Sequence, residues 1–296
     1  MNTITRFLAP AKLNLFLHIT SRRADGYHCL QTVFQFLDYC DVLCFSKRTD
    51  GILSCHYSNK LNLSPKQDLI YRAAHLLQQY SGTPLGADIQ VEKKIPMGGG
   101  LGGGSSNAAT TLLALNKIWQ LHLPYVILAE IGLKLGADVP VFVHGTAAWA
   151  EGIGELLTPI TLDEPWYLVI EPGCHVSTAE IFNAKDLTRD ALSVTKDEFL
   201  AGQCKNVCEE VVRCRYPPVG EALDWLSQYS PARLTGTGAC LFARFDDFTL
   251  ANAVLLELPS QWQGFVAQGK NISPALDSIP LKKGNHKGLP LRTVQM

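Results

Sequence analysis

Residues 96–106 constrain the fold of this chain more than any other segment, because six of these eleven residues are glycine. Glycine has no Cβ and reaches φ > 0 freely, so the backbone here can approach a ligand closely. An apolar strand is expected over residues 87–94, and apolar residues recur at helical spacing over residues 108–119. The order of strand, glycine loop and helix predicts a phosphate cradle, where loop N–H groups and the positive end of the helix dipole converge.

Two common nucleotide-binding motifs do not explain this segment. Gly98, Gly100 and Gly103 match the spacing of the dinucleotide fingerprint, but no Asp or Glu occurs over residues 107–129 to hold a ribose. No Lys follows the last glycine, which excludes a Walker loop. A flexible linker is disfavoured because an apolar strand and an apolar-faced helix flank the segment directly. The pattern favours an ATP-dependent kinase for a small soluble molecule over an oxidoreductase.

Three polar residues end the glycine segment. Ser105, Ser106 and Asn107 are available as N-caps of the expected helix. The hydroxyls of Ser105 and Ser106 are also available to phosphate or to a Mg²⁺ ion that accompanies the nucleotide. Beyond that contact we expect no metal site.

Composition excludes several classes of function. The chain has 296 residues, 47% hydrophobic and 18% charged, as in a folded enzyme of one large or two ordinary domains. The net charge is −1 without a long basic run, so neither nucleic acid nor an anionic membrane is an expected partner. No signal peptide or membrane-spanning run is recognisable, which predicts a cytoplasmic protein. The nine cysteines are scattered, and Cys204, Cys208 and Cys214 lack a second pair for zinc, so we expect mostly reduced core cysteines.

Periodicity outlines the first half of the chain. Residues 11–20 alternate as a strand with a partly polar face, and residues 30–45 have the composition of a second strand. A turn is expected between these strands at residues 24–26. A further helix is expected over residues 125–135, ending at Gly136 in a left-handed cap.

The pattern breaks at two prolines within residues 158–165, and a new strand is expected over residues 166–171. Amphipathic helices near residues 196–213 and 219–229 and a strand pair over residues 234–245 predict a smaller α+β unit. We therefore expect an N-terminal domain at residues 1–160, a C-terminal domain at 161–277 and a loose tail at 278–296.

Two charged residues in apolar surroundings are candidates for the chemistry. Lys12 lies on the polar face of the first strand, and Asp138 follows the helix expected over residues 125–135. If they meet, Asp138 can accept a hydroxyl proton while Lys12 offsets negative charge on the attacking oxygen or the γ-phosphate. The plain alternatives are a strand-edge charge for Lys12 and a capping role for Asp138.

Two turns also carry candidate binding residues. Tyr27 and His28 follow the Asp25-Gly26 turn and can stack on and hydrogen-bond a base or sugar, although an ordinary surface turn remains an alternative. Residues 234–240 form a second glycine-bearing turn that can close over phosphates, or serve as a plain hairpin.

Three separated segments, at residues 10–15, 96–106 and 234–240, resemble the GHMP small-molecule kinases, in the same order along the chain. Residues 23–28 and 135–142 narrow the resemblance to members that phosphorylate a cytidine diphosphate-linked methylerythritol in the non-mevalonate route to isoprenoids. The resemblance spans residues 7–274. It implies an α+β, two-domain fold with the active site in the cleft between the domains, and ATP with Mg²⁺ as the nucleotide.

The resemblance also implies roles for particular residues. Asp138 is the expected base and Lys12 its charged partner, Asn14 is expected to contact the methylerythritol part, and Tyr27, His28 and Phe182 are expected to hold cytosine. ATP contacts are expected from Pro96, Met97, Gly98, Gly99, Gly100, Leu101, Gly102, Gly103, Gly104, Ser105 and Ser106.

Alternatives within and outside the family stay open at this point. Another family member that acts on a mevalonate derivative, homoserine or a sugar shares the glycine loop. A non-catalytic nucleotide-binding relative is a further alternative, although the presence of both Lys12 and Asp138 argues against it. We expect a monomer or a weak homodimer.

Overall fold

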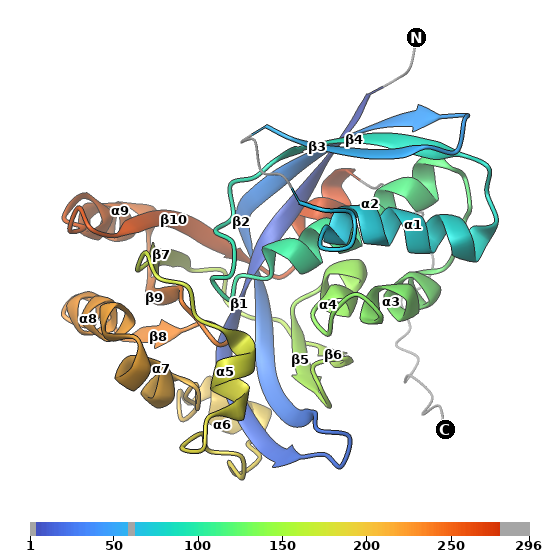
Figure 1. Ribbon diagram of the computed structural model, residues 1–296. Helices are drawn as coiled ribbons and strands as arrows, with labels where there is room; N and C mark the ends of the chain where they lie inside the picture. The colour runs from blue at the N-terminus through green and yellow to red at the C-terminus, as the bar shows by residue number, and fades with distance from the viewer. Residues whose placement is uncertain (1–3, 59–62, 279–296) are drawn as a thin grey trace.

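The computed structural model describes residues 4–58 and 63–278. A long antiparallel hairpin forms its centre: β1 (Thr5–Arg22) pairs with β2 (His28–Arg48), and a turn at residues 24–26 joins them. Both predicted strands are therefore confirmed and are longer than expected. Figure 1 shows the hairpin passing between two groups of helices, α1 to α4 on one side and α5 to α9 on the other.

One sheet of ten strands includes this hairpin. Its main path runs β3-β4-β2-β10-β7-β9-β8, while β1, β5 and β6 lie off that path. The remaining strands are β3 (Leu53–Tyr57), β4 (Gly86–Glu92), β5 (Ala148–Glu151), β6 (Leu156–Pro159), β7 (Trp166–Glu171), β8 (Ala232–Leu234), β9 (Leu241–Phe245) and β10 (Gln263–Lys270). The expected strand over residues 166–171 is confirmed. The strand pair expected over residues 234–245 is present, but its first strand, β8, lies earlier and ends at Leu234.

Four helices pack against the upper part of the sheet (Figure 1), and together they form what we call the first lobe. They are α1 (Leu69–Ser81), α2 (Gly103–Ile118), α3 (Tyr125–Leu133) and α4 (Val139–His144). Helix α2 is the central one, because Ala108, Ala109 and Leu112 are fully buried in the core that this lobe shares with β1, β2 and β4. Its small side chains let the neighbouring elements approach closely, which places its N-terminus at the middle of the hairpin.

The remaining five helices of the described residues and the strands that they cover form the second lobe, which has its own core. Its helices are α5 (Thr178–Asn183), α6 (Lys196–Leu200), α7 (Glu209–Arg215), α8 (Pro217–Leu226) and α9 (Phe248–Leu256). Leu17 and Ile19 of β1 belong to this core, whereas Phe7 and Ala9 of the same strand belong to the core of the first lobe. The hairpin is thus shared between the lobes.

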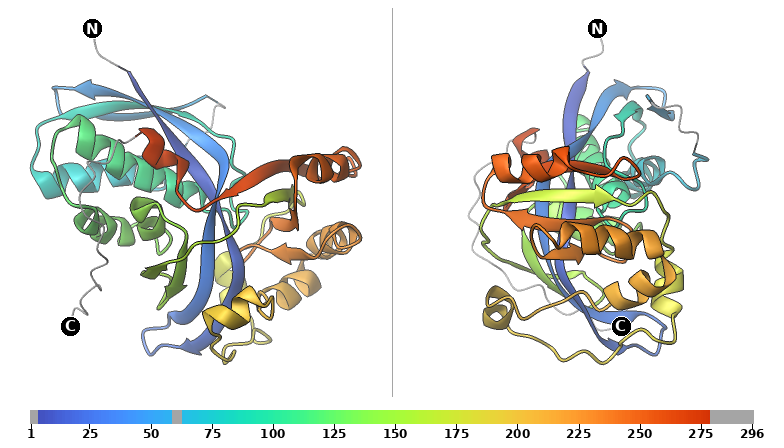
Figure 2. Two further views of the ribbon diagram at one scale, coloured as in Figure 1. Left: turned by 180° about the vertical axis from the view of Figure 1, so that it is seen from behind. Right: turned by 90° about the vertical axis from the view of Figure 1, so that its left-hand side faces the viewer.

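The chain returns to the first lobe near its end. Strand β10 pairs with β7 and also, at Gly269 and Lys270, with β2. It leads to a 3-10 helix, η1 (Pro274–Ser278), which lies beside β1 and is seen in red in Figure 2. A division of the chain near residue 160 stays a prediction, and the expected tail at residues 278–296 lies almost wholly outside the described residues.

Three local expectations are wrong. Helix α2 begins after Gly102, whose φ is 71°, and no side chain caps it, so Ser105, Ser106 and Asn107 lie inside the helix. Helix α3 ends at Leu133 with Lys134 in a right-handed cap, not at a left-handed Gly136. The helix expected over residues 196–213 is two short helices, α6 and α7. The chain turns at Gly202, where φ is 77°. Asn206 lies between the two helices, and its side chain donates to the carbonyls of Leu234 and Gly236.

A buried carboxylate fastens the glycine loop to the sheet. Asp41 of β2 is fully buried and accepts hydrogen bonds from the backbone N–H groups of Lys94 (2.7 Å) and Ile95 (2.9 Å). It also accepts from the Asn107 amide of α2 (2.8 Å) and forms an ion pair with Lys93. These bonds hold both ends of the loop against one strand. No helix of the described segments has the length and apolar character to cross a membrane.

Replacing Asp41 with Asn keeps the side-chain volume and removes the charge. Because Lys93 then stays buried without its partner, we expect the free energy of unfolding to fall by about 3–5 kcal/mol. Urea denaturation measures the change. Asp50→Asn is the matched control, since Asp50 pairs with Arg48 at the surface, and its loss should stay below about 1 kcal/mol. Equal losses in both variants would contradict the anchoring role.

Candidate active site

A cavity of about 970 Å³ lies between the two lobes. Its walls come from β1, the turn before β2, the glycine loop, α5 and the turn between β8 and β9. The candidates from the sequence that line it are Lys12, Asn14, Tyr27, His28, Asp138, Phe182 and residues 96–105. Ser106 does not line this cavity. The structure therefore brings together, with that one exception, residues that lie up to 170 positions apart in the sequence.

The glycine loop is shaped by contacts with the protein itself. Gly100 has φ of 78°, and a Cβ there would collide with the carbonyl oxygen of Thr235. Gly102 has φ of 71°, and a Cβ there would lie 3.0 Å from Cε of Lys12. The glycines are required both by backbone conformation and by the close approach of a lysine and of the second-lobe turn. From the sequence, close approach of a ligand was the one reason expected for these glycines.

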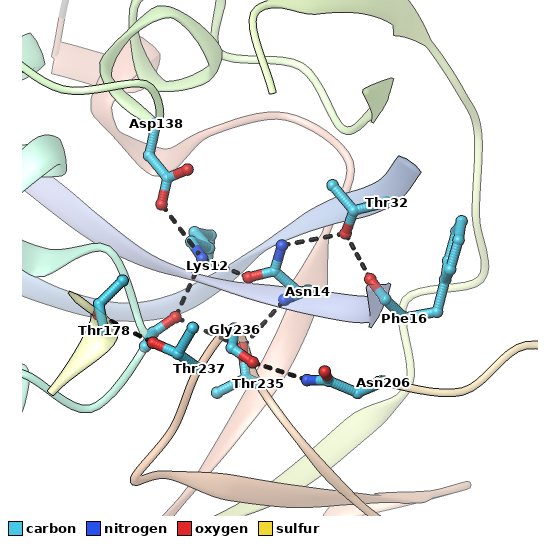
Figure 3. A network of polar contacts seen from close by, with 11 residues as sticks. Lys12, Asn14, Phe16, Thr32, Asp138, Thr178, Asn206, Thr235, Gly236 and Thr237 are labelled. Atoms are coloured by element: carbon cyan, nitrogen blue, oxygen red, sulfur yellow. Dashed lines mark hydrogen bonds and ion pairs between the residues drawn. The ribbon is translucent and has the colours of Figure 1, made fainter. Parts of the chain in front are cut away.

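Lys12 is the centre of the polar network (Figure 3). Its ammonium donates to the Asn14 side-chain oxygen and to the Gly100 carbonyl at 3.0 Å, and it lies 3.3 Å from the Asp138 carboxylate. The Lys12 side chain is 3% exposed, whereas that of Asp138 is 33% exposed. A buried ammonium needs such partners, because an unpaired charge is costly away from water. The pair expected from the sequence is present, and its carboxylate faces the cavity.

The capping alternative for Asp138 is excluded. The residue directly precedes α4, but its side chain makes no capping hydrogen bond to that helix. The carboxylate is therefore left for Lys12 and for the cavity. A carboxylate in this setting can accept a proton from a hydroxyl brought to the cavity.

Asn14 connects the Lys12–Asp138 pair to the second lobe. Its backbone N–H donates to the Thr235 hydroxyl (3.0 Å), and its side-chain amide donates to the Thr32 hydroxyl (3.0 Å). Asn206 in turn donates to the Leu234 and Gly236 carbonyls at 2.9 and 2.7 Å. Figure 3 shows this chain running from Asp138 through Lys12 to the turn between β8 and β9. That turn is thereby connected to Lys12 through Asn14.

An aromatic group lies at another part of the cavity wall. Tyr27 is 61% exposed, whereas the buried His28 ring stacks on Phe182 with 5.2 Å between centroids and 20° between planes. Burial lowers the pKa of His28, and the positive charges of Arg189 and Arg22 lower it further. Burial and these charges therefore favour the neutral imidazole, which suits hydrogen bonding to an uncharged base.

Several cavity residues are absent from the sequence-based candidates. Thr178 of α5 and Thr237 of the β8–β9 turn share a hydrogen bond of 2.9 Å, and both line the cavity. Asp68 also lines it while capping α1. The Thr235-Gly-Thr-Gly pattern in the sequence could have indicated Thr237. An Asp directly before an apolar helix could likewise have indicated Asp68 as the N-cap of α1. No local signal marks Thr178.

The donor set fits a Mg²⁺ ion that arrives with a nucleotide. Within residues 4–58 and 63–278, no three His, Cys, Asp or Glu side chains gather as a metal cage. Magnesium needs few protein ligands when phosphates supply oxygens. The Ser106 hydroxyl is buried and has no hydrogen-bond partner among the described residues, and Ser105 borders the cavity. Beside the glycine loop, the cavity wall thus offers the hydroxyl of Ser105 to such an ion.

Comparison with known proteins places this geometry in a family. The GHMP kinases N terminal domain matches residues 68–146, and the GHMP kinases C terminal domain matches residues 191–264. A crystal structure titled 4-(cytidine 5'-diphospho)-2C-methyl-D-erythritol kinase superposes with a TM-score of 0.78 at 30% identity, covering 90% of this chain and 99% of that one. Methanococcus jannaschii mevalonate kinase shares the fold at 16% identity and a TM-score of 0.67, covering 92% and 99%.

Curated relatives are more similar in sequence. The protein of Nitrosococcus oceani named 4-diphosphocytidyl-2-C-methyl-D-erythritol kinase is 57% identical over 92% of this chain and 96% of its own length. The protein of that name in Alkalilimnicola ehrlichii is 58% identical over 92% and 93%. At this identity and coverage, with both domain matches and the cleft site present, the chain belongs to the 4-diphosphocytidyl-2-C-methyl-D-erythritol kinase family of the GHMP kinases.

Proposed function

We propose that the chain transfers the γ-phosphoryl group of ATP to the 2-hydroxyl of 4-diphosphocytidyl-2-C-methyl-D-erythritol, giving the 2-phosphate and ADP. The reaction is a step in non-mevalonate isoprenoid precursor biosynthesis. The observation that carries the proposal is the Lys12–Asp138 pair, 3.3 Å apart beside the glycine loop. The names of relatives that share 52–58% identity with the chain support the choice of substrate.

The reaction needs one bond made and one broken. The substrate hydroxyl oxygen attacks the γ-phosphorus, the bond to the β,γ-bridging oxygen breaks, and ADP leaves with that electron pair. Asp138 accepts the hydroxyl proton, and Lys12 offsets negative charge on the attacking oxygen or γ-phosphate. Because transition states of phosphoryl transfer are often loose, Asp138 orients the hydroxyl as much as it removes the proton.

Asn14 holds Lys12 for this task while it lines the substrate side of the cavity. Its side-chain oxygen accepts from the ammonium, and its amide group donates to Thr32. One lone pair of that oxygen remains for the methylerythritol part. Lys12 is thus fixed between Asn14, the Gly100 carbonyl and Asp138.

The loop at residues 96–105 holds the ATP phosphates at the N-terminus of α2, where N–H groups and the helix dipole favour negative charge. Mg²⁺ that accompanies ATP would neutralise charge on its phosphate oxygens. Ser105 is the hydroxyl that the glycine loop offers to it at the cavity wall. Ser106 is fully buried and does not line the cavity.

The cytidine end of the substrate fits the aromatic group. Tyr27 and Phe182 offer faces on which a pyrimidine stacks, and the neutral His28 offers hydrogen bonding to its edge. We further propose a cytoplasmic enzyme that acts as a monomer or weak homodimer.

An acceptor panel tests the substrate assignment. With ATP and Mg²⁺, purified protein is expected to release ADP in the presence of 4-diphosphocytidyl-2-C-methyl-D-erythritol and not with mevalonate, homoserine or galactose. The coupled ADP assay measures the rate, and mass spectrometry identifies the monophosphorylated product. Turnover with one of the other acceptors alone would sink the assignment while leaving the kinase fold intact.

The Asp138→Asn variant tests the base. It retains shape and loses the proton acceptor, so kcat is expected to fall by about 10²- to 10⁴-fold while KM for either substrate changes little. Asp224→Asn is the matched control, because Asp224 is an exposed partner of Arg213 away from the cavity. Circular dichroism establishes that both variants fold. Near-normal kcat in Asp138→Asn removes this residue from the mechanism.

The Tyr27→Ala variant tests the cytidine site. Loss of one stacking face, worth about 1–3 kcal/mol per base, is expected to raise KM for the cytidine substrate roughly 10-fold or more. Tyr27→Phe keeps the face and is expected to behave like the unaltered protein. Tyr80→Ala, at an exposed position of α1, is the control. An increase of KM for ATP instead would place Tyr27 at the wrong end of the cavity.

A further inference from the structure

Arg189 connects two aromatic residues of the cavity wall, His28 and Phe182, to the segment that follows α5. It lies six residues after α5, and its guanidinium reaches His28, 161 positions away. Its Nε donates to Nε2 of His28 at 3.2 Å, and its Nη2 donates to the carbonyls of Phe182 (3.0 Å) and Ala184 (2.6 Å). A fourth bond runs from Nη1 to the Leu187 carbonyl at 3.2 Å. All four acceptors are neutral.

The bond to His28 determines which ring nitrogen carries the proton. A guanidinium has five donors and no acceptor, so Nε2 of His28 must be unprotonated. The single proton of the neutral ring then lies on Nδ1, which makes Nδ1 a hydrogen-bond donor. Protonation of Nε2 would place two donors against each other, and the charges of Arg189 and Arg22 oppose it as well.

A fixed donor distinguishes the two common pyrimidines. At ring position 3 cytosine carries an unprotonated nitrogen that accepts a hydrogen bond, whereas uracil carries an N–H that donates one. A donor held at that position pairs with cytosine and faces a second donor in uracil, leaving buried polar groups unpaired. If the ring could change tautomer freely, it would serve both bases.

The same guanidinium also fixes the stacking partner. Two of its bonds hold the carbonyls of Phe182 and Ala184 at the end of α5, where the helix has no further turn to satisfy them. The Phe182 ring therefore stays 5.2 Å from the His28 ring. Arg189 is not among the described residues that line the cavity, so it acts through its neighbours.

We propose that Arg189 is a positioning residue that makes the site selective for cytosine over uracil, by holding His28 in the Nδ1–H form against Phe182. The proposal rests on the proposed function, in which this part of the cavity binds the cytidine end of the substrate. It adds a determinant of base specificity that lies behind the cavity wall.

Kinetics with two substrates tests the proposal. Arg189→Met is expected to raise KM for the cytidine diphosphate-linked substrate about 10-fold, because His28 loses the donor that keeps its proton on Nδ1 and its bond to cytosine is weakened. We expect kcat and KM for ATP to change little. The preference for cytidine over the uridine analogue is expected to narrow by a similar factor. Arg189→Lys retains a donor and is expected to restore part of the preference. Arg213→Met, an exposed arginine on α7, is the control.

A merely structural role predicts a different outcome. In that case Arg189→Met would lower thermal stability, kcat and both KM values together, with the same loss for the cytidine and uridine substrates, and the proposal would be overturned. An unchanged base preference in a folded variant also overturns it.

A second measurement does not depend on the variant folding or on the reaction. Nitrogen-15 NMR of the unaltered protein at pH 7, with His28 assigned from a His28→Gln sample, reports which ring nitrogen is protonated. The Nδ1–H form is expected, and the Nε2–H form overturns the proposal. Absence of turnover with the cytidine substrate would refute only the proposed function. In that case calorimetry with CDP and UDP compares the base preference of the unaltered protein with that of Arg189→Met.

Discussion

The active site depends first on one buried carboxylate, that of Asp41. It collects the backbone N–H groups of Lys94 and Ile95 and the amide of Asn107, so the entry to the glycine loop and the first turns of α2 are bound to the same strand. A buried charge without such donors would cost several kcal/mol, so the loop cannot shift along β2 without losing that stabilisation. The cradle is therefore fastened to the hairpin beneath it.

The hairpin then links this cradle to the chemistry. The side chain of Lys12 extends from β1 past Gly102 and reaches the Gly100 carbonyl and Asp138. Because β1 enters both hydrophobic cores, and Asn14 bonds to Thr235 across the cleft, the two lobes meet at the Lys12–Asp138 pair. The arrangement brings the glycine loop, Asp138 and the second-lobe turn to one short stretch of β1.

Features that depend on neighbours in the sequence were predictable. The order of strand, glycine loop and α2, the alternation of β1 and the strand at residues 166–171 all follow from local periodicity, and the structure confirms them. Lys12 and Asp138 could be singled out because an isolated charge in an apolar segment is costly unless it has a partner. The family resemblance supplied Phe182, which no local pattern marks.

The strand, loop and helix order, the candidate pair and the family could be recognised without a structure, because glycine content, hydrophobic period and motif order are local properties of the chain. What these segments contact follows from the packing of the folded chain. The break before α7 exists because Asn206 bonds to a turn 28 residues away or more, and Gly102 rather than Ser105 precedes α2. Arg189 reaches His28 over 161 positions. Such pairings depend on how the two lobes pack around one hairpin, which no periodicity encodes.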